Sequence, residues 1–94
     1  MTVTNTDAFD VFAPWQLSTQ VSLRDEAFGA LAYHHGTRRL VFLKSRELVA
    51  LVRELSAFEC ANDAVRSLVP LDQYDRYVAA LASLTSSEIL SARE

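Results

Sequence analysis

The stretch Phe28–Lys44, FGALAYHHGTRRLVFLK, decides the fold, because it predicts two antiparallel strands joined at Gly36-Thr37. A two-residue turn with glycine first favours type II′, whose twist matches the strands that it joins. The resulting register places four large apolar residues on one side of the hairpin, pairing Tyr33 with Leu40 and Leu31 with Phe42. The run Leu40–Leu43 is apolar on both sides, whereas an antiparallel sheet in a small domain usually keeps one wet face. We therefore expect something to cover this strand.

A further strand is predicted before the hairpin. Apolar and polar residues alternate from Trp15 to Leu23, which is typical of a strand with one buried and one solvated side. The polar link Arg24–Glu26 then turns the chain into the hairpin. The three strands predict a meander in which Arg39–Lys44 is an edge strand with unpaired N–H and C=O groups.

After Lys44 the apolar period changes from two to about 3.6 residues, which predicts helices. Ser45 is a suitable N-cap for the first helix, whose apolar stripe consists of Leu48, Leu51, Val52, Leu55 and Phe58. Asn62 caps a short second helix, which Pro70 ends, and Asp72 opens a third. One face of the third helix carries Tyr74, Tyr77, Val78, Leu81 and Leu84.

Strands followed by helices predict the α+β class, with a helical layer on one side of an antiparallel sheet. A short helix joined tightly to the next, with the hairpin as a wing, makes the domain winged-helix-like. We expect this domain over residues 14–85, between a flexible N-terminal arm, 1–13, and a C-terminal tail, 86–94, that adds one turn and then frays. In the arm, an apolar burst either packs on its own domain or reaches a second subunit or an enzyme: Phe9, Val11 and Phe12.

The composition fits one small globular domain, since half of the 94 residues are apolar. Nine basic and twelve acidic residues give a net charge of -3, whereas nucleic-acid binders normally carry a basic surplus. A local basic cluster still suits an acidic partner: Arg38, Arg39, Lys44 and Arg46. The sequence has no apolar run long enough for a membrane span and no signal peptide, so we expect a cytoplasmic protein without membrane contact.

The residues that carry chemistry do not form a catalytic or metal-binding pattern. Cys60 is the only cysteine, which excludes an internal disulfide. His34 and His35 are neighbours on a strand and point to opposite faces, so they cannot easily share a metal ion. Asp72 and Asp75 fit helix capping better than acid–base catalysis. We predict no enzyme, no cofactor and no metal site.

A third helix beside the last strand would bound a cleft that suits an added peptide strand. We expect Leu40 and Phe42 as its floor, and a proline at Val41 to weaken binding by removing an edge N–H. The predicted wall is Tyr77, Val78 and Leu81, and the predicted rim is Arg39 and Lys44. The full set of candidate peptide-binding residues is Arg38, Arg39, Leu40, Val41, Phe42, Leu43, Lys44, Tyr74, Tyr77, Val78 and Leu81.

Two other functions compete with peptide binding. A winged-helix fold is also used to bind DNA, but the acidic balance and the alanine-rich third helix speak against base readout. Alternatively, the apolar edge pairs with a second copy of itself, which would make the chain a dimerisation domain and a homodimer.

The run LRDEAFGALAYHHGTRRLVFLKSRELVALVREL resembles the MftB family of mycofactocin-system peptide chaperones, within the PqqD-like group of precursor-peptide recognition elements. The resemblance covers Trp15 to Leu84 and is most specific over Phe28–Ser45. It implies a winged-helix-like domain that binds a ribosomally made precursor peptide, MftA, and delivers it to a radical S-adenosylmethionine enzyme, MftC. That enzyme, and not this chain, would hold the iron–sulfur clusters. In such elements the leader pairs with the third strand beside the third helix, which here means Arg39–Lys44 and the side of Tyr74–Leu81.

Overall fold

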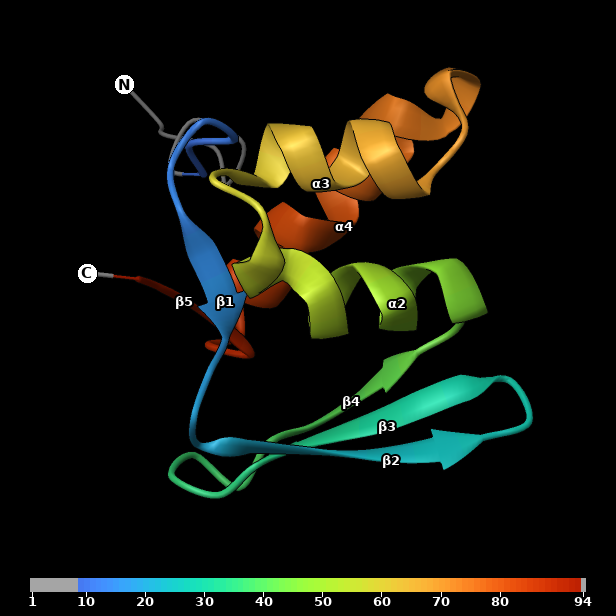
Figure 1. Ribbon diagram of the computed structural model, residues 1–94. Coiled ribbons are helices and arrows are strands. Elements are labelled where there is room, and N and C mark those ends of the chain that lie inside the picture. Colours follow the sequence, from blue (N-terminus) through green and yellow to red (C-terminus); the bar gives the residue numbers. More distant parts are fainter. Residues whose placement is uncertain (1–8, 94) are drawn as a thin grey trace, which may run out of the picture.

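The sheet lies on one side of the molecule and the helices lie on the other (Figure 1) in the computed structural model, which describes residues 9–93. The sheet has three antiparallel strands in the order β2-β3-β4: β2 Val21–Glu26, β3 Gly29–His34 and β4 Leu40–Leu43. Three α-helices follow: α2 Arg46–Glu54, α3 Ala61–Leu68 and α4 Tyr74–Ser86. The predicted α+β class, with a three-stranded meander followed by three helices, is therefore confirmed.

A second, two-stranded sheet was not predicted. Its strands are β1, Trp15–Leu17, and β5, Leu90–Ala92, which pair antiparallel. The prediction of one continuous strand from Trp15 to Leu23 is therefore wrong, because the chain turns between β1 and β2. Ser18 holds this turn: its Oγ accepts from Gln20 N at 3.1 Å and its carbonyl accepts from Val21 N at 3.0 Å.

Residues 86–93 are part of the fold, so the prediction that the tail frays is wrong for this segment, while Glu94 lies outside the described residues. Ile89 and Leu90 are buried in the core, and β5 pairs with β1. Arg93 N donates to Pro14 O at 3.0 Å, and its guanidinium donates to Phe58 O at 2.7 Å. The buried side chains of Ile89 and Leu90, the pairing with β1 and the hydrogen bonds of Arg93 together hold the segment against the core.

Part of the N-terminal arm also packs on the domain. Phe9 is buried and its ring stacks on Trp15 with the centroids 5.2 Å apart, whereas Phe12 is exposed. Phe9 thus behaves as a flap on its own domain, one of the two alternatives considered for this burst. The rest of the predicted arm, residues 1–8, lies outside the described residues.

The register predicted for the hairpin is confirmed, because Tyr33 pairs with Leu40 and Leu31 with Phe42. The predicted two-residue type II′ turn is wrong. The loop is wider: Arg38 N donates to His34 O at 2.7 Å, and Arg38, rather than Gly36, has a left-handed φ of 63°. The cause is His34, a buried side chain whose Nδ1 accepts from the backbone N–H groups of Gly36 and Thr37, both at 3.0 Å.

The turn that precedes the hairpin is also displaced from its predicted place. Arg24–Glu26 belong to β2, and the chain turns at Ala27-Phe28 instead. The polar character of these three residues reflects the exposure of the last part of β2 and not a break in the strand.

The start of the first helix agrees with the sequence, whereas its end and the starts of the next two helices differ. α2 ends at Glu54 and a short 3-10 helix, Leu55–Ala57, follows, so Leu55 and Phe58 of the predicted stripe lie beyond it. Ser45 caps α2 as predicted, since its Oγ accepts from Leu48 N at 3.0 Å. Cys60, and not Asn62, is the N-cap of α3. A short 3-10 helix, Leu71–Gln73, contains Asp72 and precedes α4.

The helices pack on the side of the sheet that carries the small residues. Ala30, Ala32 and Leu43 are fully buried on this side, while Leu40 and Phe42 are 52% and 53% exposed on the other. Alternate strand residues point to opposite faces, so the larger side chains between the alanines lie on the face away from the helices, where Tyr33 is also exposed. The predicted cleft between β4 and the third helix, with Leu40 and Phe42 as its floor, is therefore wrong, because Tyr77 and Leu81 of its predicted wall lie in the core on the opposite side of the sheet.

Gly29 allows β3 to approach the end of β4 closely. It has a φ of 149°, and a Cβ placed there would lie 2.1 Å from Leu43 O. The obstacle is backbone and cannot rotate away, so only glycine fits at this position.

We therefore predict that Gly29→Ala lowers the free energy of unfolding by at least about 2 kcal/mol, through strain and overpacking. Denaturant unfolding would measure the loss. Gly36→Ala is the matched control, because the atoms nearest its Cβ would be side-chain atoms, the closest in the ring of His34 at 3.0 Å, and not backbone. Equal losses in the two variants would contradict this role of Gly29.

Candidate functional site

Strand β4 is an edge of the sheet, as predicted, and it offers backbone groups on its free side. It has one neighbour, β3, in the order β2-β3-β4. His34 N donates to Arg39 O at 2.9 Å, so the ladder alternates from that pair onward. Val41 and Leu43 then bond to β3, and the N–H and C=O groups of Leu40 and Phe42 point away from it.

This alternation corrects one expectation about the edge. The N–H of Val41 faces Ala32 of β3, so a proline there would break the sheet and would not block the edge. The N–H groups available to another chain are those of Leu40 and Phe42. Sequence alternation placed the side chains, but it did not show which amides face outwards.

An apolar surface lies on the side of the sheet away from the helices, and we call it the outer face: Phe28, Leu31, Tyr33, Leu40 and Phe42. Four of its members are between 36% and 53% exposed. The rings of Phe28 and Phe42 have their centroids 5.8 Å apart, and Tyr33 meets His35 edge-on at 5.0 Å. Contiguous exposed apolar surface of this kind marks interaction sites.

The predicted wall on α4 is mostly engaged inside the domain. Tyr77 is buried and its hydroxyl lies 3.2 Å from Ser45 Oγ. The hydroxyl of Tyr74 donates to Asn62 Oδ1 at 2.5 Å and ties α4 to α3. Leu81 is fully buried in the core, and Val78 is half-buried. Of the predicted wall, the side chain of Leu81 is not accessible.

A small cavity of about 120 Å³ lies where the end of β4 meets α2 and α4, and we call it the corner pocket. It is lined by Lys44, Ser45, Leu48, Arg76, Tyr77 and Ala80. Two of these residues, Lys44 and Tyr77, were predicted for the site. Sequence reasoning missed Arg76 and Ala80, although they lie one and three residues from Tyr77 and their spacing of four puts them on one helix face.

The remaining basic residues of the predicted set lie at the other end of the strand. Arg38 and Arg39 are exposed at the hairpin tip, before Leu40. The structure therefore brings the predicted strand residues into one edge with cations at both ends. It separates them from the buried part of α4.

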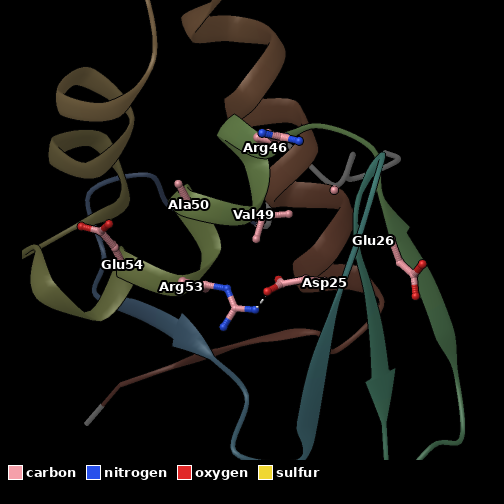
Figure 2. Close-up of a pocket in the computed structure, with 8 residues that line it drawn as sticks. Asp25, Glu26, Arg46, Val49, Ala50, Arg53 and Glu54 are labelled. Atoms are coloured by element: carbon pink, nitrogen blue, oxygen red, sulfur yellow. Dashed lines mark hydrogen bonds and ion pairs between the residues drawn. The ribbon is translucent and has the colours of Figure 1, made fainter.

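A larger cavity of about 410 Å³ lies between α2 and the β2–β3 turn, away from the free side of β4 (Figure 2). Asp25 and Arg53 point toward one another there, with Arg53 Nη2 2.9 Å from Asp25 Oδ1, while Glu26 points away. Both partners of this ion pair are substantially exposed, so it contributes little to stability. Acidic and basic side chains are mixed around the cavity, which favours no ligand of one charge.

The part of the chain that the structure describes offers no group of three or more histidine, cysteine or acidic side chains that could share a metal ion. Among residues 9–93 there is also no helix long and apolar enough to cross a membrane. The features that distinguish this molecule are thus an open strand edge, an apolar face and a basic pocket.

Comparison with protein families gives a match over most of the chain. The model of the peptide chaperone MftB family matches residues 14–91. A protein of Mycobacterium ulcerans named peptide chaperone MftB is 42% identical over 88 residues, which are 93% of this chain and 81% of that protein. Its namesake in Mycobacterium tuberculosis is 41% identical over 87 residues, 92% and 80% of the two chains. That of Mycolicibacterium smegmatis is 43% identical over 83 residues, 87% and 81% of the two chains.

A solved structure has the same fold. It is described as lasso peptide synthetase B1 complexed with the leader peptide, and it aligns with a TM-score of 0.64. The alignment covers 84% of this chain and 99% of that chain, with 19% sequence identity. At this identity the likeness establishes the fold alone.

The two faces of β4 should differ sharply in their contribution to stability. We predict that Leu40→Ala lowers the free energy of unfolding by less than about 1 kcal/mol, because this side chain already meets water. The same change at buried Leu43 should cost about 2–5 kcal/mol. Chemical denaturation of both variants checks the difference, and similar losses would mean that Leu40 is covered within the domain.

Proposed function

The chain belongs to the peptide chaperone MftB family, and we propose that it binds a ribosomally made precursor peptide of the MftA kind. It holds the peptide for a modifying enzyme and catalyses no step itself. The observation that carries this proposal is the free side of β4, where Leu40 and Phe42 present backbone groups to solvent. The solved protein of the same fold is described in complex with a leader peptide, which supports the same mode here.

The proposed mechanism is strand addition. An extended peptide segment pairs with the outward N–H and C=O groups of Leu40 and Phe42 and extends the sheet by one strand. The basic ends of this edge, Arg38, Arg39 and Lys44, attract the peptide before it pairs. Tyr74, Tyr77 and Val78 support the site from α4, and Leu81 acts from the core without touching the peptide.

The energetics of strand addition alone allow a complex of at most about micromolar affinity. Four main-chain hydrogen bonds at about 1 kcal/mol net each, with two apolar side chains at about 1.5–3 kcal/mol each, total about 7–10 kcal/mol. Ordering a short flexible peptide costs about 2–5 kcal/mol of this gross energy. The remainder, about 2–8 kcal/mol, corresponds to dissociation constants from about 1 μM to tens of millimolar, and contacts of the flanking residues with the basic ends strengthen the complex further.

The proposal includes a second partner, a radical S-adenosylmethionine enzyme of the MftC kind, which would supply all cofactors. A strand added at the edge of the sheet extends the outer face and does not cover it. This face therefore remains available for the enzyme while the peptide is bound, and effective concentration then favours transfer. We place this exchange in the cytoplasm, where ribosomally made peptides are released.

Two rival functions predict different results in simple measurements. A DNA-binding module would shift DNA in a gel at low salt, which the net charge of -3 disfavours. A dimerisation domain that pairs β4 with its own copy would release monomers when peptide is added, as light scattering would show. Peptide binding by a monomer with no DNA shift supports the chaperone.

We predict that Phe42→Pro raises the dissociation constant for the peptide about tenfold or more above that of Phe42→Ala. Both variants lose the ring, but only proline removes the outward N–H. Edge positions tolerate proline, so both should remain folded, which circular dichroism checks. Isothermal titration with a synthetic precursor peptide measures the difference, and equal affinities would rule out strand addition at this edge.

A second prediction separates the two partners. Leu31→Gln, in the centre of the outer face and away from the edge, should leave peptide affinity within about twofold and weaken enzyme binding about tenfold or more. Leu71→Gln is the matched control, because Leu71 is 73% exposed outside the sheet. Surface-plasmon measurements with immobilised enzyme test both, and an unchanged affinity for Leu31→Gln would place the enzyme elsewhere.

A further inference from the structure

The corner pocket combines two cations from distant parts of the chain. Lys44 follows β4 directly, and Arg76 lies 32 residues later on α4. No residue that lines the pocket is acidic. Both cationic side chains are exposed to solvent, so a ligand reaches them without any rearrangement of the core.

Neither cation has an ion-pair partner among residues 9–93, where the ion pairs are Arg24–Glu26 and Arg53–Asp25. The acidic residues nearest in sequence are Glu47 on α2 and Asp72 and Asp75 near Arg76. None of these three carboxylates lines the pocket. The pocket therefore holds an excess of positive charge that the domain itself does not neutralise.

The other polar groups of the pocket satisfy one another. Ser45 Oγ accepts from Leu48 N at 3.0 Å and lies 3.2 Å from the hydroxyl of Tyr77. Leu48 and Ala80 complete the wall with apolar surface. Apolar walls lower the local dielectric constant, so an anion that enters interacts with the two cations more strongly than it would in open water.

The pocket adjoins the end of β4, since Lys44 and Ser45, which line it, directly follow Leu43. Phe42, with its outward N–H, is two residues from Lys44, a distance of about 7 Å along a strand. From Thr37 to Arg46 the chain contains four basic residues and no acidic one: Arg38, Arg39, Lys44 and Arg46. A peptide strand with an apolar centre and acidic flanks matches this order of groups.

We infer that the corner pocket is a carboxylate subsite, in which Lys44 and Arg76 together bind one Asp or Glu side chain of the peptide strand added at β4. Arg76 supplies a planar fork of donors and Lys44 a point charge, so one carboxylate can face both. The subsite fixes the register of the peptide, because only one acidic residue reaches it when Leu40 and Phe42 are paired. This inference rests on the proposed function, whose peptide it describes more closely.

The test is a double-mutant cycle between the chain and a synthetic copy of the mycofactocin precursor peptide. Lys44→Gln and Arg76→Gln are titrated calorimetrically against the peptide and against copies in which each Asp or Glu becomes Asn or Gln. Each protein variant should weaken binding about three- to tenfold, since these are charge-assisted contacts at a partly exposed site. The loss should shrink at about 0.5 M salt, where charges are strongly screened.

Coupling identifies the subsite. One peptide replacement should produce the same loss as Arg76→Gln and should cause no further loss when the two are combined. Arg66→Gln on α3 is the matched control, because it removes the same charge outside the pocket and should change the affinity less than twofold. Circular dichroism checks that every variant is folded.

The outcomes distinguish the two proposals. If the unaltered chain does not bind the precursor at all, the proposed function fails. If it binds, but Lys44→Gln and Arg76→Gln behave like Arg66→Gln, the carboxylate subsite is wrong and strand addition stands. Losses of equal size against every peptide copy, without coupling to one acidic residue, would also overturn the subsite and indicate general charge attraction instead.

Discussion

The alternation of hydrogen bonds along the antiparallel strand β4 determines which of its backbone groups bond to the sheet and which stay free. The backbone groups of Val41 and Leu43 bond to β3, and those of Leu40 and Phe42 point away from the sheet. Within the described part of the chain no other strand pairs with them. A short strand thus joins the domain on one side and stays open on the other, and the proposed function needs both sides.

The packing of the sheet explains why its outer face is apolar and exposed. Ala30 and Ala32 allow α2 to lie close to β3, and Gly29 lets the end of β4 approach it closely. Small residues on the helical side leave the larger ones, Leu31 and Tyr33 among them, on the opposite side. Burying those larger residues would remove more apolar surface from water, so their exposure costs stability and points to a use in binding.

Sequence reasoning predicted what local pattern determines and failed where distant packing decides. The register of β3 and β4, the Ser45 cap and the order of strands and helices follow from alternation, capping chemistry and a change of period. The buried side of the sheet does not, because alternation defines two faces without saying which one the helices cover. The pairing of β1 with β5 could not be predicted either, since a strand as short as Leu90–Ala92 has no periodicity to detect.

In the candidate site, too, local sequence pattern predicted some features and distant packing decided the others. The open edge was predicted correctly from the strand order, whereas its outward amides depend on which pairs are hydrogen-bonded. The hairpin loop defines them, through His34, Arg38 and Arg39. The role of Arg76 could not be predicted from the sequence. Arg76 and Lys44 line one pocket only because α4 packs beside the start of α2, a contact between segments far apart in the chain.

Amide hydrogen exchange, read by NMR with and without precursor peptide, tests the central proposal most directly. In the free chain the amides of Val41 and Leu43 should exchange slowly and those of Leu40 and Phe42 quickly. Saturation with peptide should slow the exchange of Leu40 and Phe42 and leave that of Val41 and Leu43 slow. Fast exchange at Leu40 and Phe42 in the saturated complex, with protection appearing elsewhere, would contradict strand addition at β4.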